Sequence, residues 1–67
     1  MKILKVIEIM ADSDKSWEDA VGNAVEKASD SVKHIKSAFV QSQSCTVKDG
    51  KVNSYRVNVK VTFEVGG

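Results

Sequence analysis

The 67-residue sequence has one cysteine, one histidine and no proline. A single cysteine, Cys45, excludes a disulfide within the chain, and one cysteine with one histidine cannot make the usual kind of zinc site. Ten basic and nine acidic residues give a net charge of +1, which argues against a nucleic-acid partner and against binding to a charged membrane surface. The sequence therefore lacks the disulfides and the Cys/His zinc sites that stabilise many very short chains.

The short length also limits the hydrophobic core. An unfolded chain of this mass exposes roughly 10,600 Å² and a compact monomer about 4,200 Å². If about 60% of the difference is apolar, burial contributes on the order of 95 kcal/mol. Ordering all the residues costs about 100 kcal/mol. We expect a single domain over residues 1–67 that gains further burial by association with copies of itself.

The hydrophobic first ten residues carry Lys5 and Glu8. This segment is too short and too polar for a signal peptide or a membrane span. An unpaired cysteine fits a reducing compartment. We expect a cytoplasmic protein with no membrane partner.

Residues 2–10 have the composition of a strand with apolar side chains on both faces. One face carries Ile3, Ile7 and Ile9, and the other carries Leu4, Val6 and Met10. A single helix can cover only one of these faces. The second face therefore predicts contact with another subunit.

Residues 17–33 have the periodicity of a helix, with Ser16 as the predicted N-cap. The apolar positions at helical spacing are Trp17, Ala20, Val21, Ala24, Ala28 and Val32. Lys33, His34 and Lys36 stand where cations suit the negative end of the helix dipole. The small side chains predict close packing on a sheet, with Trp17 as an anchor.

Residues 37–47 and 54–65 have strand composition, and Asp49-Gly50 between them is a strong hairpin signal. In the first of these strands, alternation predicts one face with Ala38, Val40, Ser42, Ser44 and Thr46 and another with Phe39, Gln41, Gln43, Cys45 and Val47. The last strand alternates without a break and is expected at the centre. We predict an α+β fold with a β-α-β-β subunit, whose three-stranded antiparallel sheet, in order 1-3-2, wraps on one helix.

Nearly the whole chain resembles the dodecin family. The resemblance rests on Lys5-Val6-Ile7-Glu8-Ile9, on Ser16-Trp17-Glu18-Asp19-Ala20, on Ala28-Ser29-Asp30-Ser31-Val32 and on a Tyr-x-Val-x-Val-x-Val-x-Phe pattern over residues 55–63. It implies a hollow homododecamer built from trimers. Many members store or sequester flavins (FMN, riboflavin or FAD) without catalysis.

The resemblance also implies a ligand pocket. In flavin-binding members, a tryptophan at the start of the second strand stacks on the flavin, and a glutamine after the tyrosine of the third strand bonds its polar edge. This sequence has Ser37 and Arg56 at those positions, with Gln43 near the same pocket. Serine has no stacking face, whereas Arg56 can donate to a carbonyl oxygen or a phosphate. The expected ligand is a flavin or a related phosphate-bearing molecule.

The residues before the helix offer an alternative ligand. Asp12 and Asp14 alternate with serine as at the start of a calcium loop. Trp17 stands where an EF-hand needs glycine, and Asn23 where it needs glutamate. These carboxylates are therefore either an acidic helix start or part of a weak calcium site shared at a subunit contact. The alternative function is a flavin-free structural or calcium-binding dodecin.

Catalysis is not expected. Cys45 and His34 have no second base or orienting acid at a convincing spacing. Arg56, Lys60 and Lys51 on the polar face of the last strand form either an anion site or a solvated sheet face. A further possibility is a monomeric module that extends its sheet onto a peptide.

Overall fold

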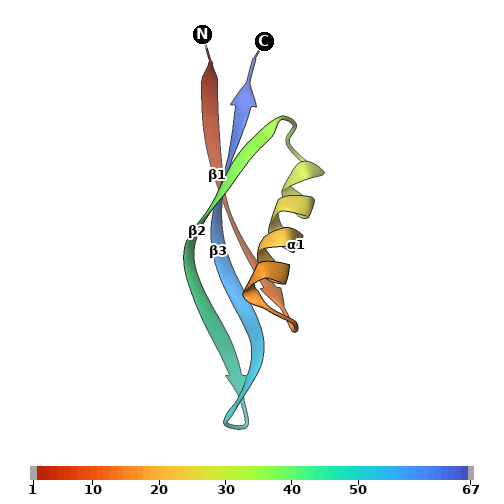
Figure 1. The fold of residues 1–67 in the computed structure, drawn as a ribbon, viewed down its shortest axis with the longest axis vertical. Helices are drawn as coiled ribbons and strands as arrows, with labels where there is room; N and C mark the ends of the chain where they lie inside the picture. The colour runs from red at the N-terminus through yellow and green to blue at the C-terminus, as the bar shows by residue number, and fades with distance from the viewer. Residues whose placement is uncertain (1, 67) are drawn as a thin grey trace.

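A computed structural model of the chain describes residues 2–66, which form three strands and one helix (Figure 1). The elements are β1 (Ile3–Ser13), α1 (Trp17–Ser29), β2 (Ile35–Lys48) and β3 (Lys51–Val65). Both outer strands pair antiparallel with β3, in the order β1-β3-β2. The predicted α+β fold and strand order are confirmed. The ends of the predicted domain, Met1 and Gly67, lie outside the described residues.

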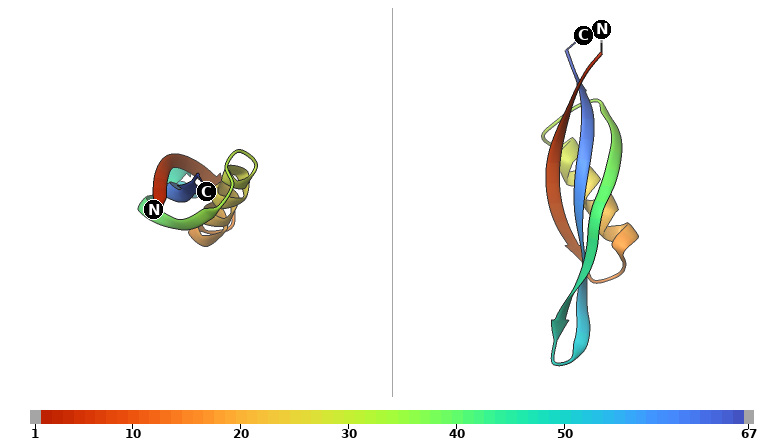
Figure 2. Two further views of the ribbon diagram at one scale, coloured as in Figure 1. Left: turned by 90° about the horizontal axis from the view of Figure 1, so that it is seen from above. Right: turned by 90° about the vertical axis from the view of Figure 1, so that its left-hand side faces the viewer.

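The helix lies against one face of the curved sheet (Figure 2), and small side chains form the contact. The buried residues of this core are Ala20, Ala24, Ala28, Val57, Val59 and Val61. Because an alanine side chain ends at Cβ, α1 lies close to the valines of β3. The alternation that predicted this face of β3 is confirmed.

Hydroxyl groups hold the start of the helix. The Ser16 Oγ accepts a hydrogen bond from the Asp19 amide at 3.0 Å, which confirms the predicted N-cap. Ser13, at the end of β1, was not singled out from the sequence. Its buried Oγ donates to Asp19 Oδ2 at 2.7 Å and accepts from the Lys15 amide at 2.9 Å. This serine ties the strand to the first turn of the helix.

The predicted extent of the helix, to Lys33, is wrong. The helix ends at Ser29, and its last turn contains Lys27 but not the three basic residues expected there. The chain turns away through His34, which has a φ of 62°, and the His34 carbonyl accepts from the Glu64 amide at 3.0 Å. The return to the sheet ends the helix, although the apolar spacing continues to Val32.

The second strand is less regular than its composition predicts. Pairing of β2 with β3 shifts after Ile35 and after Val40, so that Lys36 and Gln41 are extra residues. Such a bulge reverses the alternation of the side chains beyond it. As a result Gln43 lies opposite Val57, on the helix side. The prediction that Gln43 shares a face with Phe39 is wrong.

The described chain is long and narrow. Its principal extents are 51 × 19 × 14 Å, and the β2–β3 hairpin projects beyond α1 and the end of β1 (Figure 1). The radius of gyration is 13.7 Å, against about 11 Å for a compact domain of this length. No helix within residues 2–66 is long and apolar enough to cross a membrane.

The close helix–sheet contact yields a first prediction. Ala24→Leu forces three extra carbon atoms into the space between α1 and β3, and should lower the free energy of unfolding by about 1–3 kcal/mol. Glu26→Leu places the same side chain at an exposed helix position and should change stability by about 0.5 kcal/mol or less. Chemical denaturation of both variants checks this. Equal effects would contradict the packing account.

Candidate functional site

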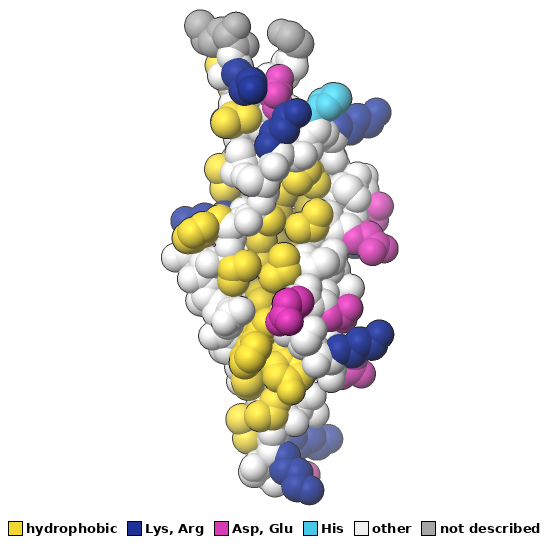
Figure 3. Space-filling model, viewed as in Figure 1, with side chains coloured by type: hydrophobic (Ala, Val, Ile, Leu, Met, Phe, Trp, Pro, Cys, Tyr) yellow, Lys and Arg dark blue, Asp and Glu magenta, His cyan; other side chains and the backbone are white. Residues whose placement is uncertain are grey.

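The sheet face that α1 leaves uncovered, called here the helix-free face, carries exposed apolar side chains along both edges. Leu4, Val6 and Met10 from β1 and Phe39 from β2 are between 51% and 64% exposed. Strand register puts them on the side opposite the buried valines of β3. Figure 3 has the helix at the right and views the sheet from one edge, so the helix-free face is turned to the left of that view. The predicted two-sided apolar character of the first strand is confirmed.

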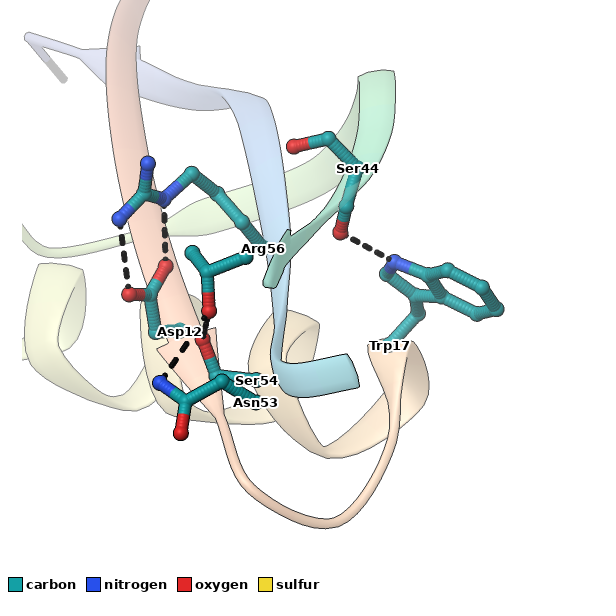
Figure 4. Close-up of polar contacts among 7 residues, drawn as sticks. Asp12, Trp17, Ser44, Asn53, Ser54 and Arg56 are labelled. Atoms are coloured by element: carbon teal, nitrogen blue, oxygen red, sulfur yellow. Dashed lines mark hydrogen bonds and ion pairs between the residues drawn. The ribbon is translucent and has the colours of Figure 1, made fainter. Parts of the chain in front are cut away.

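Between these edges, β3 presents a row of polar side chains. They are Arg56, Asn58, Lys60, Thr62 and Glu64. Arg56 lies directly opposite Asp12 of β1. Its Nε donates to Asp12 Oδ1 at 2.7 Å and its Nη2 donates to Oδ2 at 3.0 Å (Figure 4). Two parallel hydrogen bonds give this ion pair a defined geometry. One predicted metal ligand and one predicted ligand-binding residue therefore bind each other.

The ion pair also changes the acidity of both groups. The hydrogen bond from Arg56 lowers the pKa of the Asp12 carboxyl below its ordinary value. The same contact raises the pKa of the Arg56 guanidinium. Both side chains are less than half exposed, at 44% and 42%. At neutral pH the pair is fully ionised.

One chain does not gather the three predicted pocket residues. Ser37 lies opposite Thr62, whereas Arg56 lies opposite Ser44. Both are on the helix-free face, but six residues of β3 separate them, which is about 20 Å at 3.3 Å per residue. Gln43 lies on the other face. A pocket formed by these residues would need more than one subunit.

Phe39 is an aromatic residue that the sequence did not single out for this face. Its partner on β3 is Lys60, and the partner of Ser37 is Thr62, so both β2 side chains point away from the helix. Phe39 therefore offers an exposed ring two residues along from Ser37. Strict alternation grouped it with Gln43, because nothing in the sequence marks the bulge at Gln41.

Trp17 has a structural position at the start of the helix. Its indole Nε1 donates to the Ser44 carbonyl at 2.9 Å (Figure 4). Its ring centre is 5.0 Å from that of Tyr55, with an angle of 73° between the planes. Such an edge-to-face pair contributes about 0.5–1.5 kcal/mol beyond area burial. Trp17 is thus the predicted anchor between α1, β2 and β3.

Cys45 and His34 are far apart. Cys45 is exposed and lies opposite Tyr55, whereas His34 contacts Glu64 at the other end of β3. Nine residues along a strand separate these positions by about 30 Å. Within one chain they cannot act together.

The described residues of one chain do not make a complete metal site. Residues 2–66 contain no group of three or more His, Cys, Asp or Glu side chains that could hold an ion. Calcium takes six to eight oxygen ligands, whereas Asp12 is paired with Arg56 and Asp14 is exposed. The same residues enclose no pocket. A calcium ion or a flavin does not fit within a single described chain.

Within residues 2–66, one buried side-chain atom has no hydrogen-bond partner, and it belongs to the helix-free face. The side-chain oxygen of Asn58, Oδ1, is buried without a hydrogen bond. Asn58 lies opposite Met10 of β1 and Ser42 of β2. A buried acceptor of this kind costs free energy unless a donor or a cation satisfies it.

Comparison with known proteins defines the class of the chain. The dodecin family model matches residues 3–66. The chain therefore belongs to the dodecin family, and the resemblance seen in the sequence is confirmed.

Individual dodecins are similar to this chain in sequence and in structure. The calcium dodecin of Mycobacterium tuberculosis is 38% identical over 65 residues, which cover 97% of this chain and 92% of the relative. The crystal structure of that calcium-chelating protein has a TM-score of 0.83 and 40% identity, covering 96% of this chain and 91% of the other. Dodecin from Streptomyces coelicolor has a TM-score of 0.92 at 26% identity, covering 98% and 94%.

The Asp12–Arg56 pair predicts a defined pH dependence. Because the folded pKa of Asp12 is lowered, the pair stabilises the fold above the ordinary aspartate pKa of about 3.9. That stability is lost as the pH falls through the lowered pKa. Asp12→Asn should therefore melt below the unchanged protein at neutral pH, and the gap should close progressively as the pH falls below about 4. Melting temperatures from pH 2 to 8 check this, and a constant gap would contradict it.

Proposed function

We propose that this chain is a subunit of a cytoplasmic, hollow homododecamer built from trimers, which holds a small ligand between subunits without catalysis. The observation that carries the proposal is the helix-free face, where Leu4, Val6, Met10 and Phe39 lie exposed. Family membership supports twelve copies. The exposed Cys45 is compatible with a reducing compartment.

The surface area supports assembly quantitatively. The chain exposes 4888 Å², whereas a compact monomer of its mass exposes about 4,200 Å². The excess, about 700 Å², is close to the roughly 800 Å² that each partner buries in a standard protein interface. Copies of the chain would remove from water the apolar edges that one helix leaves uncovered.

Calcium is the ligand that we favour. The calcium dodecin is about 40% identical to this chain over nearly its whole length, and the stacking tryptophan expected of a flavin site is replaced by Ser37. One chain has too few free oxygen donors, so the ion would require carboxylates from neighbouring subunits. Asp12 and Asp14 are the groups that this chain would contribute.

A flavin or another phosphate-bearing molecule is the second candidate. Phe39 is an exposed aromatic ring on the same face as Ser37, and a ring in that position could stack on a planar ligand. Arg56 could bind a phosphate only if it released Asp12. Ser37 and Gln43 would complete this pocket from more than one subunit.

Assembly can be tested by placing a charged side chain on the helix-free face. Light scattering on a sizing column should give twelve times the 7.3 kDa chain mass. Val6→Lys places a charge among the apolar side chains of the helix-free face and should reduce the mass several-fold, because an unpaired charge is costly in an interface. Asn23→Lys, on the exposed side of α1, should leave the mass unchanged. A folded monomer for the unchanged protein, with native circular dichroism, would contradict the proposal.

The two ligands give different signals. Calcium at millimolar concentration should raise the melting temperature relative to chelator, because a ligand that binds only the folded state stabilises it. Asp12→Asn combined with Asp14→Asn should abolish this rise. Riboflavin added at tens of micromolar should lose fluorescence only if the protein binds flavin. A dodecamer that responds to neither ligand would leave assembly standing and overturn both ligands.

A further inference from the structure

The tip of the β2–β3 hairpin is a second exposed apolar surface of the chain. Apart from Ile3, the large hydrophobic side chains that are exposed within residues 2–66 fall into two groups. The first group lies on the helix-free face. The second consists of Val47 and Val52, which are 68% and 55% exposed and lie opposite each other on β2 and β3. Neither valine belongs to the core of the subunit.

The tip valines point to the helix side of the sheet. Tyr55, whose ring contacts Trp17, is on that side, and its partner on β2 is Cys45. Val47 follows Cys45 by two residues, and side chains two apart on a strand share a face. Val52, opposite Val47, has the same orientation. This apolar surface is therefore separate from the helix-free face.

No part of the subunit covers the tip. The pairing of β1 with β3 ends at Ser13 opposite Tyr55, so residues 46–54 form a two-stranded ribbon beyond β1 and α1 (Figure 1). A two-stranded hairpin alone is marginally stable in water. Asp49 and Gly50 have positive φ values of 53° and 76°, which is the geometry of a tight type I′ turn. The turn gives the tip a defined shape, but its valines stay in contact with water.

The tip also carries positive charge. Lys48 and Lys51 lie directly opposite each other, where like charges repel. Neither lysine takes part in the two ion pairs found within residues 2–66. Figure 3 shows basic side chains at the lower end of the molecule, below a group of hydrophobic ones. A surface that covers this tip should therefore be apolar with acidic groups at its border.

The start of α1 has this composition. The aromatic rings of Trp17 and Tyr55 are partly exposed there, and Cys45 beside them is exposed. Asp14 and Glu18, on either side of Trp17 in the chain, are exposed acids. Residues 14–19 contain three acids and one lysine, a net charge of −2. Two tips, or two helix starts, would place like charges together, whereas a tip against a helix start joins opposite charges.

We propose that the hairpin tip of one chain packs against the start of α1 in a second copy of the chain. This inference rests on the proposed homododecamer. A particle built from trimers needs at least two kinds of contact, one that closes the trimer and one that joins trimers. The helix-free face supplies one of them, and the tip supplies the other. Because the tip contact joins two different surfaces, it closes a ring when the rotation between copies is a whole fraction of a turn.

The first test removes the apolar part of the contact. Val47→Thr combined with Val52→Thr keeps side-chain shape and strand preference but adds two hydroxyl groups to the contact. The protein concentration at which the particle dissociates should rise by on the order of tenfold. Light scattering on a sizing column over a dilution series measures this. The dissociated species should be larger than one chain, because the helix-free face is unchanged.

The second test reverses the charge. Lys48→Glu combined with Lys51→Glu places acids against the acidic helix start, and should raise the dissociation concentration by about tenfold or more. Adding Asp14→Lys and Glu18→Lys to that variant restores opposite charges across the contact and should restore the particle.

The matched control is Lys27→Glu combined with Lys33→Glu. It makes the same change in net charge at exposed residues outside the tip, and should leave the mass unchanged. Circular dichroism of each variant should match that of the unchanged protein.

The outcomes separate this inference from the proposed function. If the unchanged protein is a dodecamer and both tip variants dissociate as the control does, the tip contact is refuted while the assembly stands. If the reversed tip dissociates but the added lysines do not restore the particle, the helix start is not the partner surface, and the inference is also overturned. If the unchanged protein is a folded monomer, the assembly and the tip contact both fail.

Discussion

The structure depends on the contact between three alanines of α1 and three valines of β3. Ala20, Ala24 and Ala28 contribute little volume, so the helix backbone lies close to the sheet. This contact is efficient but narrow, and it buries only one face of a curved three-stranded sheet. The other face, with its apolar edges and polar centre, is left uncovered by the helix. Residues 2–66 contain no second helix that could cover it.

The helix-free face combines two kinds of chemistry. Its edges provide apolar area for association, whereas the centre, from Arg56 to Glu64, carries charges and amide groups. In an assembly such a polar row either pairs with itself or holds a ligand, because buried polar groups must be satisfied. In this chain one member of the polar row, Arg56, already forms an ion pair with Asp12 of the same chain. A second member of the row, Asn58, has a buried side-chain oxygen without a hydrogen-bond partner.

The sequence predicted the fold well, whereas the contacts of the candidate residues became visible only in the structure. The strand order follows from a regular last strand and a strong Asp49-Gly50 turn, because alternation and turn chemistry are local signals. The end of the helix at Ser29 depends on how the chain returns to the sheet, which apolar spacing does not encode. The bulge at Gln41 has no sequence signal and moved Gln43 to the helix side. Cross-strand contacts such as Asp12 with Arg56 depend on register, which one sequence alone did not reveal.

The irregular second strand bears on whether an assembly of these chains stays finite. A regular unpaired edge is a template for adding strand after strand, and that is how sheets grow into fibrils. The β2 edge is interrupted after Ile35 and after Val40, and each bulge twists the strand and breaks the even spacing of its free amide and carbonyl groups. A subunit with so much apolar surface is prone to open-ended aggregation. In the proposed assembly, such interruptions would oppose growth at that edge and favour closure.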